Sequence, residues 1–132
     1  MPRSGSSCYL DSSAVVKLVV VEPETAALNG HLEARPVRLS SALVRTEVIR
    51  AVRPHGPDAL QRAWAVLDRL DLLAVDRVVL DSAGMLDPST LRSLDAIHLA
   101  SALRLRTGEL VTYDRRLAEA GRAVGLVSVT PR

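Results

Sequence analysis

Short apolar segments, each ending near a polar or acidic residue, alternate along the chain with longer segments of helical spacing. The short segments predict strands at residues 7–10, 37–39, 72–75, 109–112 and 126–129. The segments between them predict helices at residues 12–21, 23–34, 42–53, 58–70, 77–83, 94–106 and 114–120. Because strands that alternate with helices favour a parallel sheet covered on both faces, we expect an α/β fold.

The length and composition fit one domain over residues 1–132, with an irregular start over residues 1–6. With 48% hydrophobic and 24% charged residues, the chain lies in the ordinary globular range and outside the disordered class. No apolar run is long enough to span a membrane. The apolar stretch after Arg3 is interrupted by Asp11 and Lys17, which makes a poor secretory signal, so we expect a cytoplasmic protein.

The basic residues and the single cysteine limit which ligands the chain can bind and which cross-links or metal sites it can form. Lys17 is the only lysine among 17 basic residues, and the others are arginines, which suit bidentate contact with phosphate. The net charge of +2 favours an anionic partner only weakly. Cys8 stands alone, so neither an intrachain disulfide nor a thiolate metal cluster can form.

Three acidic residues lie where helices are predicted to start. Asp11 and Asp114 each follow a strand, and Asp95 lies in the first turn of a helix. Acids at such positions also cap helices, so a purely structural role stays open. In a doubly wound sheet the first and fourth strands are neighbours, which would place Asp11 beside Asp114 at the carboxyl edge. Thr112 could hold a carboxylate through its hydroxyl, although strand propensity explains it equally well.

Glu47 is not explained by helix capping. At 100° per residue it falls inside the apolar arc of its helix, which also contains Val44, Val48 and Val52. A carboxylate on a buried helix face is unfavourable by several kcal/mol unless something neutralises it. A buried arginine, a proton or a metal ion could do so. We favour the metal ion, with a structural arginine as the alternative.

The helix predicted at residues 94–106 is apolar nearly all round, so we expect it to be buried. His98 lies one turn after Asp95, and among leucines and alanines it is expected to be a hydrogen-bonded core residue. With no second histidine nearby there is no zinc spacing, and the all-oxygen donors favour Mg²⁺ or Mn²⁺. Trp64, at helical spacing in residues 58–70, is also expected in the core.

Four short motifs occur in order along the chain. They are Tyr9-Leu10-Asp11-Ser12-Ser13-Ala14, Glu47 in a helix after the second strand, Leu94-Asp95-Ala96-Ile97-His98-Leu99-Ala100, and Thr112-Tyr113-Asp114. With these motifs the chain resembles a PIN domain of the VapC type, the toxin ribonuclease of bacterial and archaeal toxin–antitoxin pairs. No single motif is specific, but together they cover nearly the whole chain. The resemblance implies a three-layer α/β/α sandwich with a central parallel sheet.

The resemblance also implies a catalytic cluster of four carboxylates that binds one or two Mg²⁺ or Mn²⁺ ions: Asp11, Glu47, Asp95 and Asp114. We expect the hydroxyls of Ser12 and Thr112 to support this cluster. Two basic residues recur near such sites in similar proteins, and here they either contact substrate or pair with acids: Lys17 and Arg92.

The implied activity is metal-dependent endonucleolytic hydrolysis of RNA, with tRNA or ribosomal RNA as the substrate class and a 5′ phosphate on the product. A divalent ion relieves the repulsion among the carboxylates and lowers the pKa of a bound water. The implied partners are the RNA, a VapB-like antitoxin that inserts an arginine or lysine into the acidic pocket, and a second copy of the chain in a homodimer.

Two other functions are consistent with parts of the pattern. A non-catalytic PIN-like scaffold that binds RNA or a protein partner would share the fold, although the complete acid set argues against it. A receiver-type signalling domain could use Asp76 as its phosphate acceptor. Receivers need paired acids after the first strand and a lysine after the last, and this sequence has neither.

Overall fold

The computed structural model describes residues 6–132, and a five-stranded parallel sheet forms its centre. The strand order is β3-β2-β1-β4-β5, with β1 Ser7–Leu10, β2 Val37–Ser41, β3 Asp71–Leu73, β4 Glu109–Val111 and β5 Val127–Val129. The predicted parallel sheet and the predicted pairing of the first and fourth strands are confirmed. The irregular start expected over residues 1–6 lies, except for Ser6, outside the described residues.

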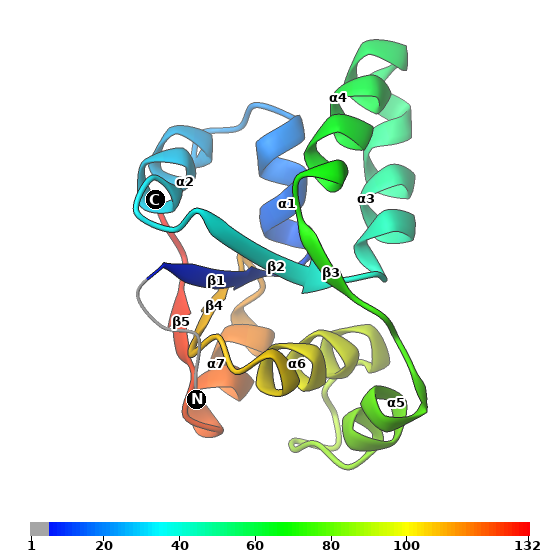
Figure 1. Ribbon diagram of the computed structural model, residues 1–132, viewed down its shortest axis with the longest axis vertical. Helices are drawn as coiled ribbons and strands as arrows, with labels where there is room; N and C mark the ends of the chain where they lie inside the picture. The colour runs from blue at the N-terminus through cyan, green and yellow to red at the C-terminus, as the bar shows by residue number, and fades with distance from the viewer. Residues whose placement is uncertain (1–5) are drawn as a thin grey trace.

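Two layers of helices cover the sheet (Figure 1). One layer contains α1 Ser12–Val19, α2 Thr25–Leu32, α3 Val44–Val52 and α4 Pro57–Asp68, with a short 3₁₀ turn at Arg53–His55 between α3 and α4. The other contains α5 Arg77–Gly84, α6 Ser93–Leu105 and α7 Arg115–Ala123. This is the expected three-layer sandwich. Within residues 6–132 no helix has the length and apolar character needed to cross a membrane.

Strand β1 runs through the middle of the sheet and is buried along its whole length. Its side chains alternate between the faces: Cys8 and Leu10 pack with the first helical layer, and Tyr9 packs on the opposite side. Because helices cover both faces of the sheet, Cys8, Tyr9 and Leu10 all lie in the core, and the strand is anchored from both sides. Asp11, the first residue after β1, is thereby held at the carboxyl edge of the sheet.

Helix α4 does not bury Trp64, which was expected in the core. Ala59, Ala63 and Leu67 face the core, whereas Trp64 is 41% exposed, with the guanidinium of Arg45 5.3 Å from the centre of its ring. The expectation of a core tryptophan is wrong. The small alanine side chains let α4 pack closely against α1 and α3. With this alanine face toward the core, the large ring of Trp64 lies at the surface.

Gly121, which directly follows the helix predicted at residues 114–120, does not end that helix. Helix α7 continues to Ala123, and the chain turns at Gly125, which has a φ of 93°. Gly121 lies instead at a close approach between α7 and the sheet. A Cβ atom on it would meet Ser128 Oγ at 2.7 Å and Leu110 Cδ2 at 3.0 Å.

Candidate active site

The carboxyl ends of β1 and β4 lie side by side, and a cleft of about 350 Å³ opens beyond them. Strands of a parallel sheet end at a common edge, so residues that follow different strands meet there although they are far apart in the chain. The residues that line the cleft come from the starts of α1, α6 and α7 and from α3: Asp11, Ser12, Ser13, Glu47, Arg92, Ser93, Leu94, Asp95 and Asp114. All four predicted carboxylates are among them.

Asp11 is the most buried of these acids, with 3% of its surface exposed. Its Oδ1 accepts hydrogen bonds from the Ala14 backbone N–H at 3.1 Å and from Ser13 Oγ at 2.6 Å, and its Oδ2 accepts one from Thr112 Oγ1 at 2.6 Å. Asp11 therefore caps α1 and also contacts the cleft. Burial raises the pKa of its carboxyl group above the ordinary value, in spite of the hydrogen bonds from Ser13 and Thr112, which act in the opposite direction.

Two hydroxyls, those of Thr112 and Ser13, connect the end of β1 to the turn after β4. Thr112 Oγ1 accepts a hydrogen bond from the Asp114 N–H at 3.0 Å while it donates to Asp11. Ser13 Oγ accepts from the Tyr113 N–H at 2.9 Å and donates to Asp11. The expected support from Thr112 is thus present as a contact. Ser13 was not among the site residues predicted from the sequence, although its position two residues after Asp11 was a usable signal.

Glu47 projects from α3 toward α6 and the start of α1. Its Oε2 lies 3.3 Å from Ser12 Oγ, which donates to it, and its Oε1 lies 2.6 Å from His98 Nε2. The expected core position of His98 is confirmed, because only 1% of its surface is exposed and its Nδ1 lies 2.7 Å from the Tyr9 hydroxyl. The partner of Glu47 is therefore this histidine, not the structural arginine that the sequence left open.

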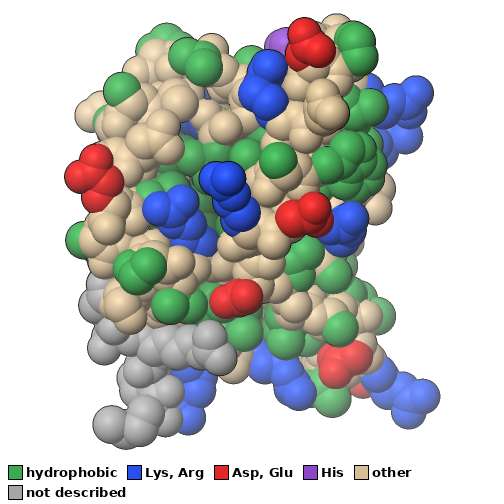
Figure 2. All heavy atoms as spheres, turned by 45° about the horizontal axis from the view of Figure 1, so that its top comes forward, with side chains coloured by type: hydrophobic (Ala, Val, Ile, Leu, Met, Phe, Trp, Pro, Cys, Tyr) green, Lys and Arg blue, Asp and Glu red, His purple; other side chains and the backbone are tan. Residues whose placement is uncertain are grey.

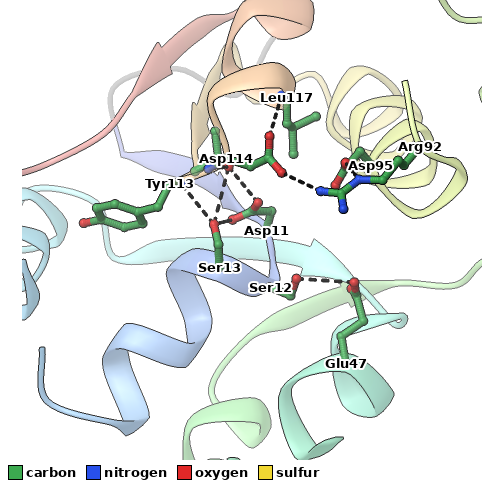
Figure 3. A network of polar contacts seen from close by, with 10 residues as sticks. Asp11, Ser12, Ser13, Glu47, Arg92, Asp95, Tyr113, Asp114 and Leu117 are labelled. Atoms are coloured by element: carbon green, nitrogen blue, oxygen red, sulfur yellow. Dashed lines mark hydrogen bonds and ion pairs between the residues drawn. The ribbon is translucent and has the colours of Figure 1, made fainter. Parts of the chain in front are cut away.

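The remaining two acids share one arginine. Arg92 Nη2 lies 3.1 Å from Asp114 Oδ2, and Arg92 Nε lies 3.4 Å from Asp95 Oδ2 (Figure 3). Asp114 also caps α7 by accepting from the Leu117 N–H at 3.0 Å. Desolvation, followed by the negative charge of Asp114, raises the pKa of Asp95, and Arg92 opposes this shift. The site therefore concentrates negative charge that Arg92 neutralises only in part.

Lys17 does not line the cleft. Its Nζ lies 3.3 Å from Glu22 Oε2 and 3.1 Å from Glu24 Oε2, and 4.7 Å from the centre of the Tyr113 ring. The pairing with acids, which the sequence left open, is what the structure contains, and substrate contact by Lys17 stays a prediction. Asp76 caps α5 by accepting from the Val79 N–H and is also not among the residues that line the cleft.

The donor set suits a hard divalent cation, because it consists of carboxylate oxygens with hydroxyls beside them. The guanidinium of Arg92 lies between the carboxylates of Asp95 and Asp114 and partly neutralises their negative charge. Within the described part of the chain, no three acidic, histidine or cysteine side chains are close enough together to hold a metal ion as they stand.

The sequence matches the family model of the PIN domain over residues 8–123. Ribonuclease VapC46 of Mycobacterium tuberculosis is 50% identical over 128 residues, which cover 96% of this chain and 98% of that protein. Ribonuclease VapC47 of the same species is 42% identical over 130 residues, which cover 93% of this chain and 96% of that protein.

Solved structures with the same fold have lower sequence identity. A toxin–antitoxin complex from Klebsiella pneumoniae aligns with a TM-score of 0.75 at 22% identity, over 96% of this chain and 98% of that chain. The Mycobacterium tuberculosis toxin VapC20, described as cleaving the sarcin–ricin loop, aligns with a TM-score of 0.76 at 19% identity, over 95% of this chain and 100% of that chain. These two likenesses support the fold.

Proposed function

This chain belongs to the PIN domain family, among relatives that are VapC ribonucleases, and from that premise we propose that residues 1–132 form one metal-dependent endoribonuclease domain. The observation that carries the proposal is the meeting of four carboxylates from separate elements in one cleft: Asp11, Glu47, Asp95 and Asp114. They are the ligands and catalytic residues, and the ion is Mg²⁺ or Mn²⁺. A bound divalent ion supplies a water of lowered pKa and stabilises charge on a phosphate.

The residues around the carboxylates either orient these acids or contact the RNA. Asp11 is fixed by hydrogen bonds from Ser13 and Thr112, so it is preorganised at the centre of the cleft. Ser12 contacts Glu47 and lies at the same rim. Arg92 has a side chain that is 69% exposed, so it is free to leave Asp95 and Asp114 and to contact a phosphate of the RNA.

Exposed arginines on the first helical layer provide a route for the rest of the RNA backbone. Figure 2, in which this layer comes forward, shows Lys and Arg side chains spread among hydrophobic ones. Arg45, Arg50 and Arg53 are exposed on α3 and the turn that follows it. Contacts of this kind are electrostatic and independent of sequence, so affinity for RNA falls as salt rises.

The substrate class is tRNA or ribosomal RNA, the product carries a 5′ phosphate, and the activity belongs in the cytoplasm, where these RNAs are. Because the Klebsiella pneumoniae structure of the same fold is a toxin–antitoxin complex, we assign this chain a VapB-like antitoxin as partner. We also assign it a homodimeric assembly, which the resemblance to VapC toxins implies. An arginine or lysine of the antitoxin would enter the acidic cleft and take the role that Arg92 has toward Asp95 and Asp114.

The proposal is tested by incubating the purified protein with total bacterial RNA in Mn²⁺ or Mg²⁺, and in EDTA. We expect discrete fragments with 5′ phosphate and 3′ hydroxyl ends, which RNA ligase can join, and no fragments in EDTA. Asp11→Asn should abolish them, and Asp81→Asn, at an exposed acid on α5, should not. Equal behaviour of wild type and Asp11→Asn would refute the nuclease and favour the non-catalytic scaffold.

A further inference from the structure

We propose that His98 is a positioning residue of this site. Its Nε2 holds one carboxylate oxygen of Glu47, and the other oxygen then lies beside Ser12 in the cleft. Tyr9 in turn fixes the ring of His98. The inference rests on the proposed function, in which Glu47 ligates a divalent ion. It assigns a task to two buried residues, Tyr9 and His98, that the proposed chemistry does not otherwise use.

The contacts form one continuous path from the core to the cleft. The hydroxyl of Tyr9 lies 2.7 Å from His98 Nδ1, and His98 Nε2 lies 2.6 Å from Glu47 Oε1. The rings of Tyr9 and His98 pack edge to face, with centroids 5.8 Å apart and an angle of 73° between their planes. Tyr9 is fully buried and His98 is 1% exposed, so neither ring can rotate without disturbing the core.

The chemistry of the groups fixes the direction of each hydrogen bond. A carboxylate can only accept, so Nε2 of His98 carries the proton and donates to Glu47. With the ring proton on Nε2, Nδ1 of the neutral imidazole is an acceptor, so the Tyr9 hydroxyl donates to it. The path therefore runs from Tyr9 through His98 to Glu47 with every donor facing an acceptor.

This arrangement restricts a flexible side chain. Glu47 has several rotatable bonds, and without a fixed partner it would lose rotamer freedom each time an ion bound. The bond from His98 removes much of that freedom beforehand and leaves Oε2, which is 3.3 Å from Ser12 Oγ, on the cleft side. Partners that orient a metal ligand in this way typically change metal affinity by about 10- to 100-fold.

Two amide substitutions separate positioning from packing. In His98→Gln the amide nitrogen lies the same number of bonds from Cα as Nε2, so it can still donate to Glu47. In His98→Asn both amide atoms lie one bond nearer to Cα, so the oxygen can accept from Tyr9 but the nitrogen does not reach Glu47. Both variants remove the ring. If His98 had only a structural role, both should lose Mn²⁺ affinity to the same extent.

The experiment measures Mn²⁺ binding to the RNA-free protein by calorimetry, alongside RNA cleavage. We expect His98→Asn to weaken Mn²⁺ binding about 10-fold and His98→Gln to stay within about threefold of wild type. In a Glu47→Gln background, His98→Asn should add no further loss, because its effect passes through Glu47. If His98→Asn does not fold, Tyr9→Phe takes its place, with a loss of about two- to fivefold that also disappears in the Glu47→Gln background.

The outcomes distinguish this inference from the proposed function. Wild-type protein that binds Mn²⁺ and cleaves RNA, with His98→Asn binding Mn²⁺ as tightly, overturns the inference alone. Equal losses of Mn²⁺ affinity in His98→Asn and His98→Gln also overturn it. So does a loss from His98→Asn that has the same size in the wild-type and Glu47→Gln backgrounds. Wild-type protein that neither binds Mn²⁺ nor cleaves RNA overturns the proposed function and this inference together.

Discussion

The hydroxyl of Thr112 donates to the carboxylate of Asp11 at 2.6 Å, although the two residues are 101 positions apart in the chain. The same oxygen accepts the backbone N–H of Asp114 at 3.0 Å. One buried hydroxyl therefore joins the acids that follow two neighbouring strands, and it fixes their separation at the edge of the sheet.

Replacing Thr112 by valine keeps the shape of the side chain and removes both hydrogen bonds. We expect the free energy of unfolding in urea to fall by about 1–3 kcal/mol, because a buried carboxylate loses a donor. RNA cleavage should fall as well, since Asp11 is no longer fixed. Thr112→Ser, which keeps the hydroxyl, should retain most of both properties. Equal stability of the valine and serine variants would show that the hydroxyl is not what matters.

The buried carboxylate of Asp11 should oppose folding at neutral pH when no metal is present. Its pKa is raised in the folded state, so its favourable contribution exists below the ordinary carboxyl value near 4 and is lost as pH rises through the folded pKa. In EDTA at pH 7, Asp11→Asn should therefore unfold with a free energy about 1–2 kcal/mol higher than wild type.

The difference should disappear below about pH 4, and Mn²⁺ should raise the melting temperature of wild type but not of Asp11→Asn. Thermal denaturation followed by circular dichroism measures both. Asp81→Asn, at an exposed position, serves as the control without a pH-dependent difference. A metal-free Asp11→Asn variant that is less stable than wild type at pH 7 would contradict the prediction.

The proposed site predicts that a divalent ion competes with Arg92 for the same two carboxylates, Asp95 and Asp114. Because the Arg92 side chain is 69% exposed, its ion pairs with the two carboxylates are weak. Arg92→Ala should therefore tighten Mn²⁺ binding only about two- to fivefold. The Michaelis constant for RNA should rise, because a phosphate contact is lost. The matched control is Arg115→Ala, whose ion pair with Glu119 is on the surface of α7. Weaker Mn²⁺ binding in Arg92→Ala would mean that Arg92 organises the acids instead of competing for them.

Gly121 is required for the packing of α7 on the sheet. In Gly121→Ala the new methyl group would lie 2.7 Å from Ser128 Oγ, which donates to the Ala118 carbonyl and cannot move freely. We expect a loss of about 1–3 kcal/mol in the free energy of unfolding. Gly30→Ala, in α2 with open space around it, should instead stabilise by about 0.4–1 kcal/mol. A Gly121→Ala protein as stable as wild type would contradict this account.

The sequence was sufficient where a local pattern had one physical interpretation. The bounds of β1 agree with the prediction, because an uninterrupted apolar run that ends on Asp11 fits only a strand buried on both faces. Parallel topology then brought Asp11 and Asp114 to the same edge. The burial of Trp64 was wrongly predicted, since hydrophobicity alone favours Trp64 over Ala63 and says nothing of how closely helices pack.

The partner of Glu47 required the tertiary structure. Glu47 on an apolar helix face and His98 in an apolar helix each signalled a need for a partner, but 51 residues separate them. No spacing rule connects side chains on helices from opposite layers of a sandwich. Lys17 illustrates the converse, because its acidic partners at Glu22 and Glu24 lie within seven residues of it.

Whether the four carboxylates act as one metal-dependent site is decided by the rate of Mn²⁺-dependent RNA cleavage in their carboxamide variants. Asp11→Asn, Glu47→Gln, Asp95→Asn and Asp114→Asn should each reduce the rate by about 100-fold or more, equal to about 2.7 kcal/mol of transition-state stabilisation. Asp81→Asn should keep the wild-type rate. Wild-type rates in the four site variants, or cleavage that persists in EDTA, would contradict the account.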